Sequence, residues 1–273
     1  MKFRFFIVLS VAALLATPVA ANSFFFTTGT PDGQIATLSR VSSTGKIQTE
    51  TADDFILGKS TILNQATFIG LIPTGAPLTS ISQVEIEFYH VFPNDSGPFD
   101  GRVLTRTNSP ADVEIGSATR DSLAGNLSYS VTLLNPSFSA ANSVVNGINP
   151  QPGQFTGGEG QVTGQEVMIS VNFTTPILLD ADHYFFRPEA LLGSGDFLWL
   201  SAPRPQFTGD LQSWIRNDDL APDWSRIGTD ITGQGPFNAA FSLSGSTVPE
   251  PSTLGLIGGG LSTFAFWRRK FKR

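Results

Sequence analysis

The stretch Val84-Glu85-Ile86-Glu87-Phe88-Tyr89-His90-Val91-Phe92 decides the fold class. Its even positions are mainly apolar, and they alternate with two glutamates and a tyrosine. Because successive side chains of a β-strand point to opposite faces, this pattern predicts a strand with one face toward a core. The same period of two recurs in 167–173 and 237–244, where the odd positions are the apolar ones.

Other short stretches of this kind are separated by Gly, Pro, Asn, Asp and Ser, as in chains built from strands and turns. They are Ser23–Thr28, Gln34–Arg40, Asp53–Leu57, Ala66–Ile72, Leu127–Leu134, His183–Arg187 and Phe197–Ser201. The nearest approach to a helical repeat between the two ends is Leu211–Ile215. The pattern predicts an all-β domain over residues 22–247, folded as one antiparallel β-sandwich of jelly-roll type.

Composition excludes several classes of function. The chain has 273 residues, no cysteine and two histidines, which excludes disulfide scaffolds, thiolate catalysis and cysteine-ligated metals. Its formal charge is −6, and its two ends together carry seven cations and no acid, so the middle of the chain carries −13. A domain this acidic repels phosphate backbones, and we therefore expect no nucleic acid partner.

Residues 1–21 have the layout of a secretory signal peptide. Lys2 and Arg4 precede an apolar run, and small residues after Pro18 end at Ala21. The run has 12 residues, whereas about 20 are needed to span a bilayer. We expect signal peptidase to cut after Ala21 and the protein to be exported.

Residues 248–273 read as a second signal. Pro249, Glu250 and Pro251 are followed by an uncharged, glycine-rich segment and then by a basic end that includes Arg268, Arg269 and Lys270. The basic residues predict a stop-transfer signal on the cytoplasmic side. The uncharged segment has 16 residues, so as a helix it rises only about 24 Å. We expect a short transmembrane helix that inserts transiently rather than as a durable anchor.

This order of features resembles the PEP-CTERM sorting signal of bacterial exported proteins. The resemblance implies handling by an exosortase-type processing enzyme, delivery to the cell envelope or surface, and a link to extracellular polysaccharide. The stretches Thr51–Phe55 and Phe237–Gly245 further resemble PEP-CTERM proteins that contain a β-sandwich of unknown function. The signal covers about 25 residues and by itself assigns no activity to the domain that it delivers.

Two glutamates form the candidate catalytic pair. Glu85 and Glu87 lie two residues apart on one strand face, about 7 Å from each other, a separation that glycoside hydrolysis can use. The strand lacks the Glu-x-Asp-x-x-Glu pattern of jelly-roll glycosidases, and solvated carboxylates are common on sandwich strands. We therefore expect no enzymatic activity, with a glycan-active enzyme kept as an alternative.

Oxygen-rich turns are candidates for a structural calcium, because this ion takes six to eight oxygen ligands. The candidate ligands are Asn94, Asp95 and Asp100. Their spacing matches no EF-hand, and Asn and Asp also stabilise turns through their own hydrogen bonds. We predict no other cofactor.

A tryptophan-rich region is the candidate carbohydrate site. Trp214 and Trp224 are interleaved with acidic residues that include Asp218 and Asp219. Aromatic faces beside carboxylates suit sugars, since the ring stacks on the apolar face and the acids accept hydroxyl hydrogens. The alternative is that these tryptophans belong to the core. Together, the features predict an exported, non-enzymatic envelope or matrix protein, with a carbohydrate-binding module as the first alternative.

Overall fold

The computed structural model describes residues 21–96, 108–148, 155–203, 212–221 and 223–249. Residues 23–246 form one compact unit. The expected signal peptide except Ala21, the sorting motif except Pro249, the stop-transfer cations and the expected C-terminal transmembrane helix lie outside the described residues. Among the described residues, no helix has the length and apolar character needed to cross a membrane.

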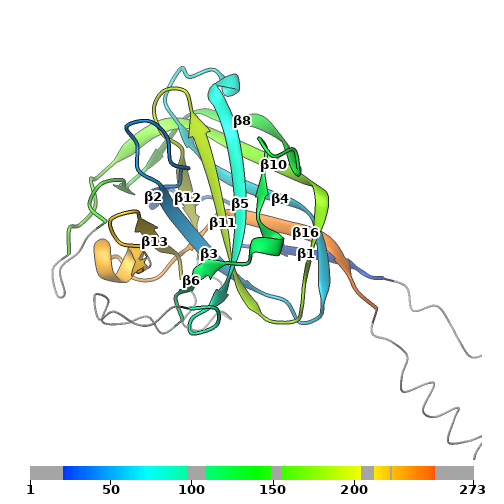
Figure 1. Ribbon diagram of the computed structural model, residues 1–273. Coiled ribbons are helices and arrows are strands. Elements are labelled where there is room, and N and C mark those ends of the chain that lie inside the picture. Colours follow the sequence, from blue (N-terminus) through cyan, green and yellow to red (C-terminus); the bar gives the residue numbers. More distant parts are fainter. Residues whose placement is uncertain (1–20, 97–107, 149–154, 204–211, 222, 250–273) are drawn as a thin grey trace, which may run out of the picture. The chain divides into compact units, whose positions relative to one another are not determined.

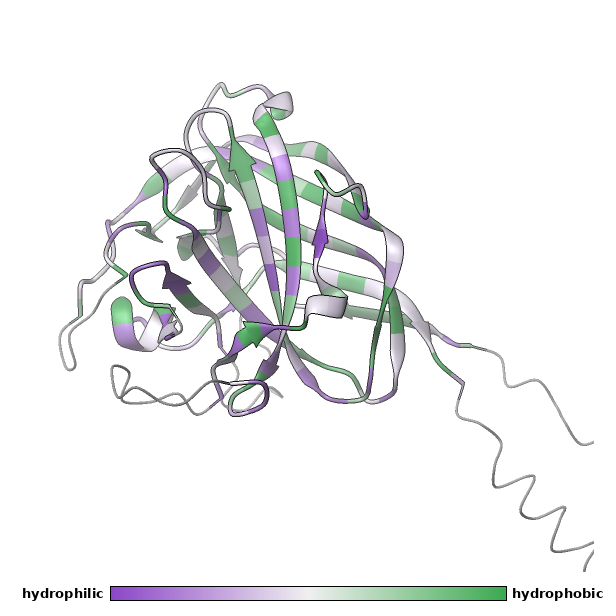
Figure 2. Cartoon of the chain, viewed as in Figure 1, coloured by the Kyte–Doolittle hydropathy of each residue, from purple (hydrophilic) through white to green (hydrophobic). Residues whose placement is uncertain are grey.

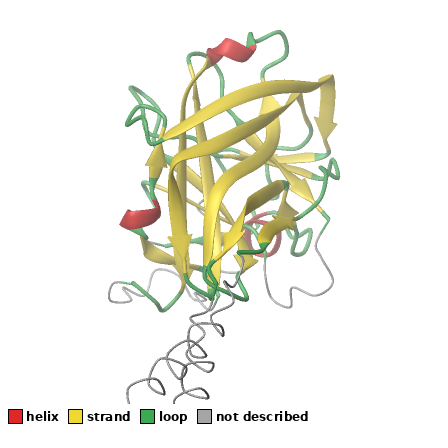
Figure 3. Ribbon diagram, turned by 90° about the vertical axis from the view of Figure 1, so that its right-hand side faces the viewer, coloured by secondary structure: helices red, strands yellow, loops and turns green. Residues whose placement is uncertain are grey.

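The described domain is built almost entirely from strands, which form two sheets (Figures 1 and 3). The larger sheet contains β1 (Ser23–Thr27), β2 (Ile35–Leu38), β4 (Thr61–Ile72), β8 (Leu127–Ala140), β9 (Asn142–Val144), β10 (Val162–Leu179), β12 (Leu198–Ala202), β15 (Asn238–Ala239) and β16 (Phe241–Thr247). The smaller sheet contains β3 (Thr49–Ile56), β5 (Ile81–Val91), β6 (Pro110–Glu114), β7 (Arg120–Asp121), β11 (His183–Leu192), β13 (Trp214–Asn217) and β14 (Ser225–Arg226). The short helices are η2 (Leu78–Ser80), η3 (Gly116–Ala118) and η4 (Ile227–Ile231).

The predicted all-β class is confirmed, and the described strands pair antiparallel except β2 with β9. The jelly-roll connectivity stays a prediction. Each strand candidate from the sequence overlaps an observed strand, most of which are longer than expected. Leu211–Ile215, the nearest approach to a helical repeat in the sequence, is not helical at the residues that the structure describes. Trp214–Asn217 is a strand, because its backbone pairs with β3, with Trp214 opposite Ala52.

The main core lies between the two sheets and follows the predicted alternation. Val84, Ile86 and Phe88 of β5 are fully buried, and so are the odd positions of 167–171 on β10. They pack with an aromatic group in which Phe186 stacks on Phe241 at 5.1 Å between ring centroids. Figure 2 shows the resulting alternation of hydrophobic and hydrophilic positions along β5. Apolar burial of this extent is the main contribution that stabilises the sandwich.

The two ends of the sandwich domain lie side by side. In register, Ser23 at the start of β1 pairs with Ser246 near the end of β16. The pairing continues to Thr27 opposite Ser242. The segments that carry the two expected signals are therefore joined to neighbouring strands at one edge of the larger sheet.

Candidate functional site

The candidate site lies on the face of the smaller sheet that points away from the main core. Strand register brings its charged groups together. Arg187 of β11 lies directly opposite Glu87 of β5, and two residues further along Glu189 lies opposite Glu85. Strand β3 is the neighbour of β11 in this sheet, and its Glu50 lies opposite Arg216 of β13. Directly opposite residues share a face, so four adjacent strands place two arginines and four glutamates on one surface.

Arg187 is the centre of this cluster. Its side chain is only 1% exposed, and it ion-pairs with four glutamates. Its Nη2 lies 2.9 Å from Glu50 and also contacts Glu87, whereas Nη1 lies 2.5 Å from Glu189 and 3.7 Å from Glu85. The Nε atom of Arg187 is buried and has no hydrogen-bond acceptor among the described residues. Arg187 is therefore enclosed by the carboxyl groups that it pairs with.

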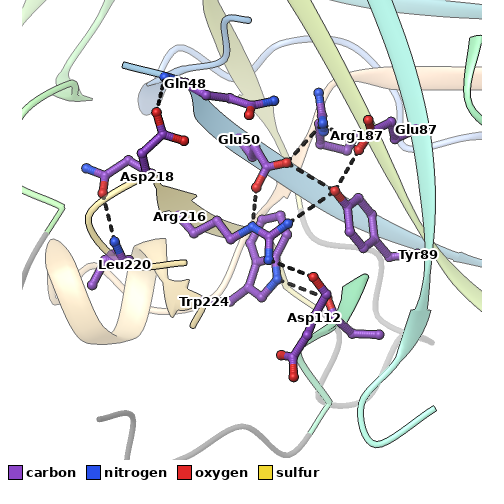
Figure 4. Close-up of polar contacts among 12 residues, drawn as sticks. Gln48, Glu50, Glu87, Tyr89, Asp112, Arg187, Arg216, Asp218, Leu220 and Trp224 are labelled. Atoms are coloured by element: carbon purple, nitrogen blue, oxygen red, sulfur yellow. Dashed lines mark hydrogen bonds and ion pairs between the residues drawn. The ribbon is translucent and has the colours of Figure 1, made fainter. Parts of the chain in front are cut away.

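Arg216 ties the cluster to an aromatic group (Figure 4). Its Nε donates to Glu50, its Nη1 donates to the carbonyl of Asp112 at 3.1 Å, and its guanidinium lies 4.5 Å from the Trp224 ring. The hydroxyl of Tyr89 lies 2.6 Å from Glu87 and 3.0 Å from Glu50. Tyr89 thus connects the ion pairs of both arginines.

The carboxyl groups have different protonation equilibria because their surroundings differ. Burial would raise the pKa of Glu50, but the charges of Arg187 and Arg216 outweigh it and lower that pKa. Burial raises the pKa of Glu189 well above its ordinary value despite Arg187, because Glu50, Glu85 and Glu87 add negative charge.

Glu85 has the most exposed side chain of the four glutamates. Burial and a hydrogen bond with Glu87 raise the pKa of Glu85 to about 7, and its side chain is still 19% exposed. The cluster therefore holds one carboxyl group that exchanges its proton near neutral pH and remains accessible.

These groups line an open cleft of about 470 Å³. Its walls are polar, and the lining residues are Val41, Ser42, Gln48, Glu50, Gln83, Glu85, Glu87, Tyr89, Glu114, Arg187 and Arg216. Carboxyl, amide and hydroxyl groups far outnumber apolar ones in this lining. A polar, hydrogen-bonding ligand fits such a surface better than an apolar one does.

The sequence singled out two of these residues but misjudged their surroundings. Glu85 and Glu87 do share a face, yet the expectation of solvated strand carboxylates is wrong for Glu87, which is 7% exposed and paired with Arg187. The sequence analysis did not select Glu50, Arg187, Glu189 or Arg216. A signal was present in Arg187-Pro188-Glu189, where charges alternate along a strand as they do at Glu85 and Glu87.

The tryptophans proposed for sugar stacking lie beside the cleft but inside the protein. Trp214 and Trp224 are 1% and 0% exposed and pack with Ala52, Tyr89 and Phe185. Their burial favours the alternative that they are core residues. Asp218 and Asp219 are exposed, and Asp218 accepts a hydrogen bond from the backbone of Gln48 at 3.1 Å.

The calcium candidates lie elsewhere, after the end of β5. Asn94 and Asp95 are exposed, and Asp95 lies 3.2 Å from His90, whereas Asp100 lies outside the described residues. Within the described ranges, no group of three or more His, Asp or Glu side chains is arranged to hold a metal ion.

Comparison with known proteins identifies the C-terminal signal. Residues 247–270 match the model of the PEP-CTERM protein-sorting motif. The chain therefore carries this motif, which implies an exported protein, anchored in the membrane by its C-terminus before processing and sorted by an exosortase. No curated protein and no solved structure matches the chain. The β-sandwich domain must therefore be interpreted from its own geometry.

Proposed function

We propose that the protein is a non-enzymatic component of the cell surface or extracellular matrix that binds extracellular polysaccharide through the cleft of the smaller sheet. The observation that carries this proposal is the cleft itself, whose walls offer carboxyl, amide and phenol groups together. Sugars present many hydroxyl groups, each of which both donates and accepts hydrogen bonds. Carboxylates and the side chains of Gln48 and Gln83 match that requirement.

The energetics of the cluster also support a functional role. Burying charges costs several kcal/mol per ion, and replacing buried ion pairs with apolar residues is often neutral or stabilising. The fold itself therefore does not require two arginines and four glutamates on this face. Their presence on this face is explained if they contribute to binding a ligand.

A glycan-active enzyme is the second candidate, because Glu85 has a pKa of about 7 and lies beside another carboxyl group. Glycosidases hold their two carboxyl groups about 5–5.5 Å or about 6.5–9.5 Å apart. Glu87 is already held by an ion pair with Arg187 and by the Tyr89 hydroxyl at 2.6 Å, so it is not free to act as a nucleophile or base. That geometry favours binding over hydrolysis at this pair.

Filling the cleft with a bulky side chain tests whether polysaccharide binds there. Ser42 is exposed and lines the cleft, whereas Thr44 is exposed in the same turn but does not line it. We expect Ser42→Trp to abolish retention of the protein on polysaccharide isolated from the producing organism, because the indole fills the cleft. Thr44→Trp is the matched control and should bind as the unmodified protein does.

Three outcomes would count against this proposal. Equal binding by both variants would place the glycan site outside the cleft. Absence of binding by the unmodified protein to any isolated polysaccharide would overturn the binding function. Shortened glycan products in the same samples, absent after Glu85→Gln, would favour the enzyme instead.

A further inference from the structure

The charged groups of the cleft differ in how far a ligand can reach them. The side chains of Arg187 and Arg216 are 1% and 8% exposed, and both guanidiniums are already paired with carboxylates. The accessible charged groups are Glu85 and Glu114, of which Glu114 is half-buried. A ligand entering the cleft therefore meets carboxyl groups and no free cation among the described residues.

The charges within the cluster also favour a cationic ligand. Two guanidiniums are matched by the two carboxylates that contact them most closely, Glu50 and Glu87. Glu85 has no comparable partner, because its nearest guanidinium atom is 3.7 Å away. It also lies beside two further acids that raise its pKa, namely Glu87 on its own strand and Asp121 on β7. A cation placed beside Glu85 would relieve this repulsion.

Resting on the proposed function, we infer that the cleft binds a glycan with free amino groups, whose ammonium contacts the carboxylate of Glu85. The neighbouring sugar hydroxyls are matched by the amides of Gln48 and Gln83. Anionic glycans are disfavoured, since neither arginine is available to them and the middle of the chain carries −13.

Binding must then displace the proton of Glu85, which moves to solvent as the ammonium takes its place. Because the pKa of Glu85 is about 7, this carboxyl group is mostly protonated at about pH 6. At that pH an amino sugar still carries its ammonium charge. We therefore expect close to one proton to be released for each amino glycan bound at about pH 6.

Isothermal titration calorimetry of the full-length chain, in buffers of different ionisation enthalpy, measures affinity and proton release together. The probes are a glucosamine tetrasaccharide, its N-acetylated counterpart and a glucose tetrasaccharide. We expect the glucosamine oligomer to bind about tenfold or more tightly than the other two, since it alone makes a charge-assisted contact. Glu85→Gln should remove the proton release and most of this preference. Glu166→Gln, on the other sheet, removes the same charge and should change neither.

The outcomes separate the two proposals. Equal affinity for all three oligomers without proton release would overturn the amino-glycan inference and leave polysaccharide binding intact. Proton release that persists in Glu85→Gln would also overturn it. If none of the probes binds and Ser42→Trp has no effect on retention by isolated polysaccharide, the proposed function itself fails.

Discussion

The outward faces of the two sheets use polar side chains in opposite ways. On the larger sheet, Gln65 of β4 donates to Asn172 of β10 at 2.8 Å and accepts from Ser244 of β16 at 3.3 Å, and all these contacts are exposed. On the smaller sheet, the corresponding positions are charged and buried. The outer face of the larger sheet is solvated, as is usual for a β-sandwich. The outer face of the smaller sheet departs from this pattern and carries a desolvation cost, which is why the proposed binding site is placed on this face.

The largest expected effect comes from removing the charge at the centre of the buried cluster. Arg187→Met would leave four carboxyl groups without their shared cation. We expect a loss of about 3–5 kcal/mol in the free energy of unfolding, as for other broken buried ion pairs. Urea denaturation near neutral pH measures it. A loss under about 1 kcal/mol would mean that the cluster is solvated and that the two faces do not differ.

An intermediate effect is expected from pH acting on Glu85. Its pKa in the folded protein is about 7, above the ordinary 4.5, so the folded state holds this proton more tightly than the unfolded state does. The contribution to stability is therefore complete below about pH 4.5 and is lost as the pH rises through about 7. Solvent contact reduces it to about 1–2 kcal/mol.

Denaturation at about pH 4.5 and about pH 8 measures this contribution. Glu85→Gln has no proton to lose, so its stability should fall less between these two values than that of the unmodified protein. Identical pH dependence in the two proteins would show that Glu85 does not titrate in the cleft.

The smallest effect on the free energy of unfolding is expected on the outer face of the larger sheet. Gln65→Ala removes two exposed hydrogen bonds whose partners, Asn172 and Ser244, can turn to water instead. We expect a change within about 0.5 kcal/mol by the same denaturation measurement. A loss as large as that of Arg187→Met would remove the contrast between the faces.

Part of the fold and of the site was predictable from the sequence. The period of two in 84–92 identified both the core face of β5 and the two glutamates that share the opposite face. The spacing of Leu211, Trp214 and Ile215 did not decide the local structure, since five residues fit a helical turn and a strand almost equally well. Backbone pairing of Trp214–Asn217 with β3 decided that segment.

The C-terminal sorting motif and the alternation along single strands were determined by the sequence alone, because each is read along a continuous segment of chain. The cleft was decided by the tertiary structure. Arg187 follows Glu87 by 100 residues, and only the pairing of β11 with β5 places them opposite each other. A one-residue shift in that register would turn Arg187 toward the apolar core. Whether a strand glutamate is solvated or buried beside an arginine thus depends on partners that its own segment does not contain.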